Sequence, residues 1–435
     1  MAGPEEIPPA RGTLLTLQCG KPAHGGTFVA RHEGRVVFVR GAGQGETVIA
    51  RLVEDDNHRP DARFWRAETV EVLEPSPDRV PTVWPQAGTD GVGGADWAHI
   101  ALPAQRRYAS EIVQELLQRA RVTTFPLEEV QVEPAPGESD GLGWRTRVRF
   151  AVDAETGRIG MRGWRSHEVH DVGANPLAHP SIGRLDLTGV DLPAGVEAVD
   201  AVAPSDGPPA LVLAGADLDP STLTPPATAA GWDLAVQNDT GLHPLVGDGT
   251  VRESVDGRGF AVAAGGFWQV HRNAATLLSH VVEQDLDVQP GDTAWDLYGG
   301  VGLFAASAAE RTGARGHVIT VEGNRRASAL AAENLADLPA VRAESSDCTA
   351  WVRAQDGADR VVLDPPRAGA GPELMELLAR SVRHRIVYVS CEPSTLARDL
   401  PVAEKAGWRI TDLRCFDLFP HTHHTESVVV LDRAA

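Results

Sequence analysis

The chain has 435 residues, enough for two or three domains at about 150 residues each. Its apolar fraction of 42% and charged fraction of 23% are typical of a folded globular protein and exclude a disordered, collagen-like or coiled-coil chain. No stretch approaches the ~18 consecutive apolar residues of a membrane span, and residues 1–10 lack the basic region of a signal peptide. We therefore expect a cytoplasmic protein without a membrane partner.

The cysteines and the charge limit the possible partners further. Cys19, Cys348, Cys391 and Cys415 form no C-x-x-C pair, so the sequence predicts neither a disulfide framework nor a zinc site and indicates a reducing compartment. The formal net charge of −20 taken alone argues against a polyanionic partner. However, residues 141–170 contain six arginines against three acids, so the acidic total hides a locally basic segment.

Short β-rich runs at residues 25–30 and 35–39 predict a small β-barrel within residues 11–75. Arginines alternate there with Phe28 and Phe38, as expected of a barrel that offers cations to phosphates and rings to bases. The same pattern also fits phenylalanines in the core and arginines on a solvated face. The four arginines are Arg31, Arg35, Arg40 and Arg51.

The passage from residue 74 to residue 85 is rich in proline and predicts a linker, and apolar spacing predicts a helix over residues 108–121. From residue 144 to residue 150, aromatic and apolar side chains alternate with Arg145, Arg147 and Arg149, which places three arginines on one strand face. This face is either an RNA-binding surface or an exposed edge kept soluble by charge. Arg162 and Arg165 continue the basic run in the next predicted strand, whereas residues 190–250 give no functional interpretation.

From about residue 265, strands alternate with helices, which is typical of a doubly wound parallel sheet. The predicted strands are Thr293 to Leu297, His317 to Glu322, Arg360 to Leu363, Ile386 to Val389 and Glu426 to Leu431.

A glycine-rich turn follows the first of these strands, at Gly299-Gly300-Val301-Gly302. Glycines let the backbone turn sharply and approach a ligand closely. Twenty residues after Gly302, Glu322 ends the next strand, where a carboxylate accepts hydrogen bonds from ribose hydroxyls. Together these residues predict a nucleoside cofactor site, and the spacing also fits the fingerprint of a nicotinamide dehydrogenase.

Two further strand ends carry reactive side chains. Asp364 precedes two prolines that stiffen its loop at the carboxyl edge of the sheet, where open α/β folds bind ligands. Cys391 follows the next strand and precedes a predicted helix. We expect the positive end of the helix dipole to lower the pKa of this thiol and so to supply thiolate.

Five motifs within residues 265–435 resemble those of the S-adenosylmethionine-dependent RNA uracil-5-methyltransferase family, which modifies transfer RNA and the large ribosomal RNA. Residues 24–46 are similar to the TRAM-type RNA-binding barrel of many members. The motifs are Gly266-Phe267-x-Gln269-Val270, Asp296-Leu297-Tyr298 with its glycines, Asp364-Pro365-Pro366-Arg367, Ser390-Cys391-x-Pro393-x-Thr395-Leu396-Ala397-Arg398-Asp399 and Phe419-Pro420-His421-Thr422-x-His424-x-Glu426.

The resemblance implies an α/β fold with a Rossmann-like class I methyltransferase domain, a doubly wound, mostly parallel sheet, at residues 265–435. It also implies an OB-like TRAM β-barrel at residues 1–75. Between them, residues 76–264 are expected to form a linker and a central α+β RNA-binding domain. The implied partners are S-adenosylmethionine and a structured RNA, ribosomal rather than transfer RNA, and we expect a monomer because the enzyme must admit a bulky RNA.

By resemblance, Cys391 is the thiolate that adds to carbon 6 of uracil, which makes carbon 5 nucleophilic. Glu426 is the general base that then removes the proton from carbon 5, and Asp364 holds the uracil edge after the base has left its stack. The residues implied at the cofactor are Gln269, Tyr298, Gly300, Gly302, Leu303, Glu322, Asp347, which is expected to reach the adenine, and Asp364.

The chain departs from the family at several positions. Leu303 replaces an asparagine that contacts the cofactor, and Glu392 replaces an asparagine after the nucleophile, where we expect its side chain to point outward. Some members bind an iron-sulfur cluster through four cysteines, but here residues 84–95 contain none and Asn175 stands in a Cys-Pro-Leu position. We therefore expect no iron-sulfur cluster, and the histidines near residue 421 fit no common zinc spacing, so we expect no metal.

Four alternatives remain at this stage. A dehydrogenase gives no role to Cys391 or Glu426. Cytosine-5 methylation uses the same thiol addition, but those enzymes often have a Pro-Cys context, which is absent here. Adenine amino methylation favours an aromatic residue after Pro-Pro, where this chain has Arg367. A non-catalytic RNA-binding protein with this fold needs neither Cys391 nor Glu426.

Overall fold

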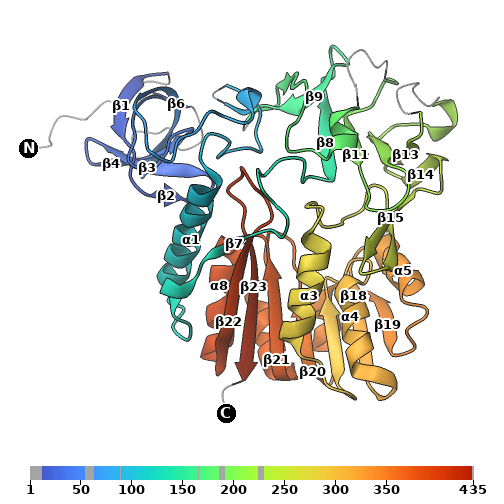
Figure 1. Ribbon diagram of the computed structural model, residues 1–435. Coiled ribbons are helices and arrows are strands. Elements are labelled where there is room, and N and C mark those ends of the chain that lie inside the picture. The colour runs from blue at the N-terminus through green and yellow to red at the C-terminus, as the bar shows by residue number, and fades with distance from the viewer. Residues whose placement is uncertain are drawn as a thin grey trace, which may run out of the picture. The chain divides into compact units, whose positions relative to one another are not determined.

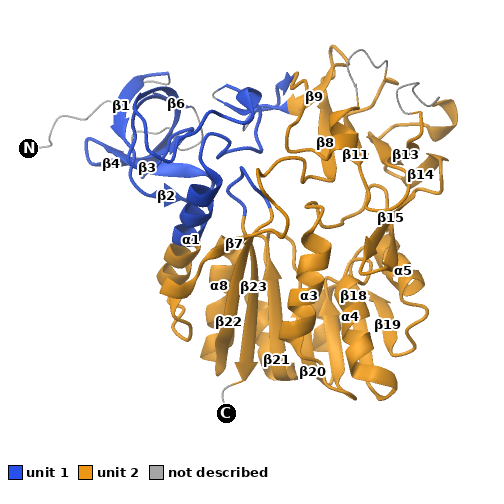
Figure 2. Cartoon of the chain, in the orientation of Figure 1, with its two compact units in different colours: residues 1–112, 162–170, 419–424 blue, residues 113–161, 171–418, 425–435 orange. Residues whose placement is uncertain are grey.

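The computed structural model describes residues 12–53, 63–88, 90–164, 166–185, 192–223 and 230–433, so that Arg165 lies outside the described residues. The chain divides into two compact units, which Figure 2 distinguishes by colour. Unit 1 consists of residues 1–112, 162–170 and 419–424, and unit 2 of residues 113–161, 171–418 and 425–435.

Unit 1 contains a six-stranded sheet in the order β1-β5-β6-β4-β3-β2. Burial alternates along its strands, as expected where one face packs on a core and the other meets solvent. The strands are β1 (Leu14–Gln18), β2 (Pro22–Ala23), β3 (Thr27–His32), β4 (Arg35–Arg40), β5 (Thr47–Leu52) and β6 (Phe64–Glu74).

The arginines predicted to bind nucleic acid on this sheet do not share one role. Arg40 is only 4% exposed, and its guanidinium donates a hydrogen bond to the Glu68 carboxylate at 3.0 Å. Arg40 therefore forms a buried ion pair with Glu68 and does not serve as a phosphate contact. Phe28 is fully buried, as the core interpretation requires, whereas Phe38 is half-buried and packs edge to face on Phe64 at 5.2 Å.

The helix α1 (Leu102–Arg119) begins six residues before the predicted start at residue 108. The polar residues from Gln105 to Arg107 interrupt the apolar spacing, so the sequence pattern does not show where the helix begins. In the structure the Gln105 amide is buried and donates to the carbonyls of Trp97 and Ile100, at 3.1 and 2.7 Å. Unit 1 also contains the 3-10 turn η1 (Pro85–Ala87) and the short strand β10 (Val169–His170).

In unit 2 a mixed sheet has the strand order β9-β8-β11-β12-β13-β14, and β15 and β16 form a separate hairpin. Residues 190–250, which the sequence left without an interpretation, supply most of this sheet. The strands are β8 (Arg147–Val152), β9 (Ile159–Arg162), β11 (Ala198–Val202), β12 (Ala210–Ala214), β13 (Asp233–Asn238), β14 (Gly241–Val246), β15 (Thr250–Val255) and β16 (Arg258–Ala263), with the short turns η2 (Leu127–Glu129), α2 (Pro180–Gly183) and η3 (Pro220–Thr222).

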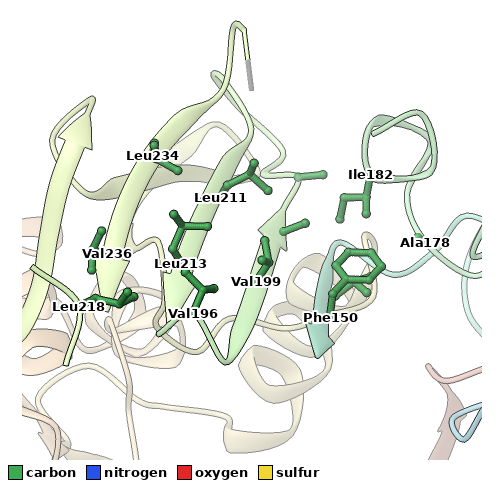
Figure 3. Close-up of a cluster of buried hydrophobic side chains, with 13 residues drawn as sticks. Phe150, Ala178, Ile182, Val196, Val199, Leu211, Leu213, Leu218, Leu234 and Val236 are labelled. Atoms are coloured by element: carbon green, nitrogen blue, oxygen red, sulfur yellow. The ribbon is translucent and has the colours of Figure 1, made fainter. Parts of the chain in front are cut away.

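Figure 3 shows the core of this sheet, where Leu211 and Leu213 of β12 pack with Val199 of β11 and Val236 of β13. All five residues of β12 are buried. Truncating one such leucine to alanine costs about 2–5 kcal/mol. A run of five buried residues shows no periodicity, and this explains why the sequence pattern did not identify the strand.

The second sheet of unit 2 has eight strands in the order β19-β18-β17-β20-β21-β23-β22-β7 (Figure 1). Strands β19 to β21 pair in parallel, and β23 pairs antiparallel with both β21 and β22. All five predicted strands are present, as β17 (Thr293–Leu297), β18 (His317–Glu322), β20 (Ala358–Leu363), β21 (Val382–Ser390) and β23 (Glu426–Arg433). The others are β7 (Val132–Pro134), β19 (Val341–Ser345) and β22 (Trp408–Asp417).

Helices alternate with these strands, as the sequence predicts for a doubly wound sheet. They are α3 (Ala274–Leu286), α4 (Leu303–Thr312) with the short η5 (Gly313–Arg315), α5 (Arg325–Asn334), α6 (Cys348–Arg353), α7 (Gly371–Ser381) and α8 (Pro393–Lys405). Within the described residues, none of the helices is long and apolar enough to cross a membrane.

Candidate active site

The carboxyl ends of the parallel strands bring several predicted site residues to one edge of the sheet. Leu297, the last residue of β17, pairs with Val321 of β18 and with Leu363 of β20, and Leu363 pairs with Tyr388 of β21. The loops that follow these strands therefore start side by side. Open α/β sheets bind ligands at this edge.

Cys391 and Glu426 are brought together by the antiparallel pairing of β21 and β23. Ser390 at the end of β21 pairs with Ser427 of β23, so Cys391 and Glu426 are the next residue on each strand. The Glu426 side chain is 2% exposed and the Cys391 side chain is half-buried. The sequence predicted both residues at the site, and the structure places them at neighbouring positions in the sheet.

Asp364 joins the same edge from β20. Its backbone amide donates to the carbonyl of Leu297 at 3.2 Å. Its Oδ2 accepts a hydrogen bond from Nε2 of Gln269, also at 3.2 Å. Gln269 lies on the segment that precedes α3, so residues separated by 95 positions meet here.

Burial and mutual repulsion shift the pKa values of the carboxyl groups. The pKa of Asp364 is raised to about 7, chiefly by burial and also by the charge of Asp296. The pKa of Glu426 is raised well above its ordinary value by burial and by the charge of Asp364. Because two buried carboxylates repel each other, we expect the pair to carry at most one negative charge near neutral pH.

The thiol of Cys391 is protonated in this environment, which corrects the expectation of a lowered pKa. Its pKa is raised to about 12, chiefly by burial and also by the carboxylates of Glu426, Asp364 and Glu392. Arg367 acts in the opposite direction and lowers the pKa. Cys391 lies two residues before Pro393, the first residue of α8.

The helix terminus is capped by Glu392. Its Oε1 accepts hydrogen bonds from the backbone amide of Ser394 at 3.2 Å and from the Ser394 hydroxyl at 2.7 Å. The carboxylate is therefore bound to its own helix, in line with the expectation that it does not point at the thiol, and it is the last of the causes that raise the pKa of Cys391.

The glycine-rich turn after β17 has a backbone conformation with positive φ angles. Gly300 and Gly302 have φ of 55° and 95°, and Tyr298, a non-glycine residue, has φ of 59°. A Cβ on Gly299 would lie 2.0 Å from the Thr320 hydroxyl, so no side chain fits there. The turn therefore approaches β18 closely.

The remaining predicted cofactor residues surround this turn. Glu322 accepts hydrogen bonds from the amide of Gly300 at 3.1 Å and from the amide of Asn324 at 2.6 Å. Asp347 is exposed and caps α6 through the amide of Ala350 at 2.8 Å. Leu303 is the first residue of α4 and is 8% exposed. It therefore offers an apolar contact and a backbone amide in place of the family's amide side chain.

Asp296 is a site residue that the sequence analysis quoted in a motif but gave no role. Its Oδ2 accepts hydrogen bonds from the Thr320 hydroxyl at 3.0 Å and from the amide of Ala305 at 3.1 Å. Its Oδ1 is buried and has no hydrogen-bond partner within the described residues. Burial raises the pKa of this carboxyl to about 7. This oxygen without a hydrogen-bond partner lies beside the glycine turn, and Glu322 and Asp347 provide two more accessible carboxylates. Such a set of acceptors fits a bound nucleoside, whose polar substituents can donate hydrogen bonds.

The three arginines predicted on one strand face differ in their partners. Arg147 forms an ion pair with Glu253 at 3.4 Å and donates to the carbonyl of Gly266 at 2.9 Å. Arg149 is exposed and pairs with Asp200 at 2.9 Å. Arg145 is half-buried, and burial together with the charge of Arg367 lowers its pKa. The sequence identified these arginines but could not show that Arg145 lies close to Arg367 of the Asp364 loop.

The histidines near the C-terminus form contacts within unit 1. Nδ1 of His423 lies 2.6 Å from Oδ2 of Asp96, and Nδ1 of His421 lies 3.1 Å from the Gln105 amide nitrogen. In the part of the chain that the structure describes, no three His, Cys, Asp or Glu side chains are grouped to hold a metal ion.

Comparisons with known proteins point to one family. Residues 329–434 match the family model described as tRNA (Uracil-5-)-methyltransferase. An RNA methyltransferase of Streptomyces avermitilis is 42% identical over 98% of this chain and 99% of its own length. The 23S rRNA (uracil(1939)-C(5))-methyltransferase RlmD of Edwardsiella ictaluri is 30% identical over 94% of each chain.

A solved structure shows the same fold. The tRNA (uracil-54, C5)-methyltransferase of Pyrococcus abyssi, in complex with S-adenosyl-L-homocysteine, matches with a TM-score of 0.70 at 20% identity and covers 96% of this chain and 100% of its own. The relative from S. avermitilis is similar along nearly the whole chain, and the family model covers the residues that carry Cys391 and Glu426. The chain therefore belongs to the S-adenosylmethionine-dependent RNA (uracil-5-)-methyltransferase family.

Proposed function

We propose that the protein methylates carbon 5 of a uridine in ribosomal RNA through a covalent bond between Cys391 and the uracil ring. The observation that carries this proposal is the pairing of Ser390 with Ser427, which brings Cys391 next to Glu426, with Asp364 at the same edge. A thiol and a buried carboxylate side by side are the two groups that addition to uracil and later proton removal require.

Cys391 begins the reaction. Its thiol gives up its proton to solvent and the thiolate adds to carbon 6 of uracil, so that a carbon–sulfur bond forms and the electron pair of the ring double bond moves toward carbon 5 and the carbonyl at carbon 4. Arg367 favours the thiolate, and an Asp364–Glu426 pair with one negative charge opposes it less than a doubly ionised pair. Carbon 5 then becomes a nucleophile strong enough to accept a methyl group.

The side chains that would hold S-adenosylmethionine are those of Gln269, Tyr298, Glu322 and Asp347. Gly300 and Gly302 would form the turn beneath it. When bound, S-adenosylmethionine supplies an electrophilic methyl group on a sulfonium centre. Glu322 is half-buried, so its carboxylate remains open to ribose hydroxyls while it anchors the turn through Gly300. Leu303 adds an apolar contact at the start of α4.

Glu426 completes the reaction. After methylation, carbon 5 carries both the new methyl group and its original proton. The Glu426 carboxylate takes that proton, the electron pair of the carbon–hydrogen bond re-forms the ring double bond, and the bond between carbon 6 and sulfur breaks. Asp364, held by Gln269, orients the uracil edge during these steps.

Several features of the described residues support an RNA substrate. The charge of Arg367 adds to burial in lowering the pKa of Arg145, and a phosphate that contacts both guanidinium groups would relieve this repulsion. Phe267 is 70% exposed, two residues before Gln269, and is available for stacking on a base. On the sheet of unit 1, the Arg35 guanidinium lies 4.5 Å from the centre of the Trp65 ring.

The choice of ribosomal over transfer RNA is supported by relatives named for 23S rRNA. RlmD of Edwardsiella ictaluri and RlmD of Shewanella amazonensis are 30% and 28% identical, over 94% and 96% of this chain. All four cysteines are free, which suits an enzyme of the reducing cytoplasm, where we place it.

The test is mass spectrometry of nucleosides from RNA incubated with the purified protein and S-adenosylmethionine that carries a deuterated methyl group. The RNA comes from a strain that lacks the gene, and ribosomal and transfer RNA are assayed separately. We expect labelled 5-methyluridine in the ribosomal fraction. Label in 5-methylcytidine would overturn the proposed reaction, and label confined to transfer RNA would overturn the proposed substrate.

A further inference from the structure

The loop of residues 364–371, between β20 and α7, carries both Asp364 and Arg367, and side chains of α8 hold its backbone. The hydroxyl of Thr395 donates to the carbonyl of Arg367 at 3.2 Å. Nη2 of Arg398 donates to the carbonyl of Ala368 at 2.8 Å. Two consecutive peptide groups beside the reactive thiol are thus fixed by one face of a neighbouring helix.

Asp399 stands at the centre of these contacts. Its side chain is fully buried, and Oδ2 accepts hydrogen bonds from the Tyr388 hydroxyl at 2.9 Å and from the amide of Gly371 at 3.1 Å. Oδ1 accepts from Nε of Arg398 at 2.8 Å. The Tyr388 hydroxyl in turn accepts from the amide of Ala370 at 2.9 Å. A buried carboxylate is costly unless it is paired and hydrogen-bonded, and these donors satisfy it.

Gly369 shows how closely the loop packs on this cluster. Its φ of +76° is a left-handed conformation, and a Cβ there would lie 2.6 Å from Nη2 of Arg398 and 2.7 Å from Oδ2 of Asp399. Any side chain at residue 369 would push the loop away from α8. Gly371 has a similar φ of +82°, but a Cβ there would meet nothing within 4 Å.

We propose that Asp399, Tyr388 and Arg398, here called the Asp399 cluster, are positioning residues that hold the 364–371 loop so that Arg367 stays within electrostatic reach of the Cys391 thiol. The cluster touches no reacting atom and acts through the loop. The inference rests on the proposed role of Cys391 as the nucleophile.

The charges around Cys391 explain why the position of this loop matters. Glu426, Asp364 and Glu392 raise the pKa of the thiol, and Arg367 is the group that lowers it. Asp364 is held separately, by the carbonyl of Leu297 and by Gln269. If the rest of the loop shifts and Arg367 moves away, Asp364 stays in place and the carboxylates act on the thiol unopposed. The thiolate fraction at neutral pH then falls, by a factor of about ten for each unit by which the pKa rises.

The primary variant is Tyr388→Phe, which removes one hydroxyl and leaves the aromatic ring in place. The assay measures the rate of covalent adduct formation with RNA that contains 5-fluorouridine, in the presence of S-adenosylmethionine, from pH 6.5 to pH 9.5. Fluorine cannot be removed from carbon 5 as a proton is, so the adduct persists. We expect the maximal rate of adduct formation to fall about tenfold at every pH in this range, because the thiol pKa of about 12 lies above it, while KM for this RNA changes less than about twofold.

Two glycine variants form a matched pair. Gly369→Ala and Gly407→Ala both place alanine at a positive φ, but a Cβ at Gly407 meets nothing within 4 Å and only Gly369→Ala places a Cβ against the Asp399 cluster. We expect Gly369→Ala to reproduce the tenfold defect of Tyr388→Phe and Gly407→Ala to keep the wild-type rate. Tyr108→Phe removes a comparable buried hydroxyl bonded to Asp78 at 2.6 Å in unit 1 and serves as a control for loss of stability alone.

The outcomes separate the two proposals. Adduct formation by Tyr388→Phe and Gly369→Ala at the wild-type rate would overturn the positioning role, even if both variants melt at a lower temperature. If Tyr388→Phe does not fold, the comparison of Gly369→Ala with Gly407→Ala decides. If the wild-type protein forms no adduct but still methylates unmodified RNA, the proposed role of Cys391 fails, and this inference fails with it.

Discussion

The charge of Asp364 raises the pKa of Glu426, so the two acids that flank the candidate nucleophile do not ionise independently. Glu426 is the first residue of β23, and Asp364 follows β20, two strands away in the sheet order. Repulsion between the two carboxylates therefore destabilises the folded protein when both are ionised, at the edge where the substrate is proposed to bind. The stability of the protein should for this reason depend on pH.

Asp364→Asn should stabilise the protein above neutral pH. A carboxyl whose folded-state pKa is raised to about 7 contributes stability below its unfolded pKa, near 4, and this contribution is lost as the pH rises through about 7. Removing the titrating group abolishes that loss. We expect a melting temperature about 2–4 °C above wild type at pH 8.5 and a smaller difference at pH 4.5. A difference that grows toward acid pH would contradict the assigned pKa direction.

Cys391→Ala should abolish turnover, with a loss of at least about a thousandfold in kcat, because no other group supplies the covalent step. Binding of S-adenosylmethionine, measured by calorimetry, should remain within a factor of about two. Cys19→Ala, which removes a buried thiol of unit 1, is the matched control and should keep its activity. Appreciable methylation by Cys391→Ala would exclude the covalent route.

Glu426→Gln should permit methyl transfer and block the release of product. The amide cannot take the proton from carbon 5, so the bond between carbon 6 and Cys391 should persist. We expect a protein–RNA band on a denaturing gel that contains the labelled methyl group. Glu392→Gln, which alters the cap of α8, should give no such band. Release of methylated RNA by Glu426→Gln at the wild-type rate would refute the role of general base.

Arg145→Gln should weaken RNA binding more than cofactor binding. If Arg145 and Arg367 share a phosphate, loss of one cation should raise KM for RNA about tenfold at low salt and reduce the dependence of binding on salt concentration. Arg149→Gln, which alters an exposed arginine paired with Asp200, is the control and should change KM less than about threefold. Equal effects of the two substitutions would indicate diffuse electrostatic attraction instead of a specific contact.

Much of the catalytic sheet could be predicted from the sequence, because its strands are buried apolar runs followed by glycine, proline or reactive residues. Thr293–Leu297 and His317–Glu322 have the predicted bounds. The strand Trp408–Asp417 was not predicted, since it contains Arg409, Asp412 and Arg414 and lacks a clear apolar run. The strands within residues 190–250 were not predicted for a different reason, because their apolar runs are short and, as in β12, show no periodicity.

The site was predicted as a set of residues, but its electrostatics were not. The sequence indicated a helix dipole acting on Cys391, whereas in the structure burial and the charges of Glu426, Asp364 and Glu392 raise the pKa of the thiol. These effects come from residues far apart in the chain, so a local sequence pattern does not reveal them. Asp399 was part of a family motif, but its role could not be predicted because its partners Tyr388 and Gly371 lie outside its helix.

The strand order β21-β23-β22 also determines when this sheet is completed during synthesis. Strand β22 leaves the ribosome before β23, yet its antiparallel partner is β23, which must insert between β21 and β22. Until then, the backbone edges of β21 and β22 lack the strand that lies between them and can pair with other chains. The nascent chain therefore has an unfilled position between these two strands until Glu426 to Arg433 insert there.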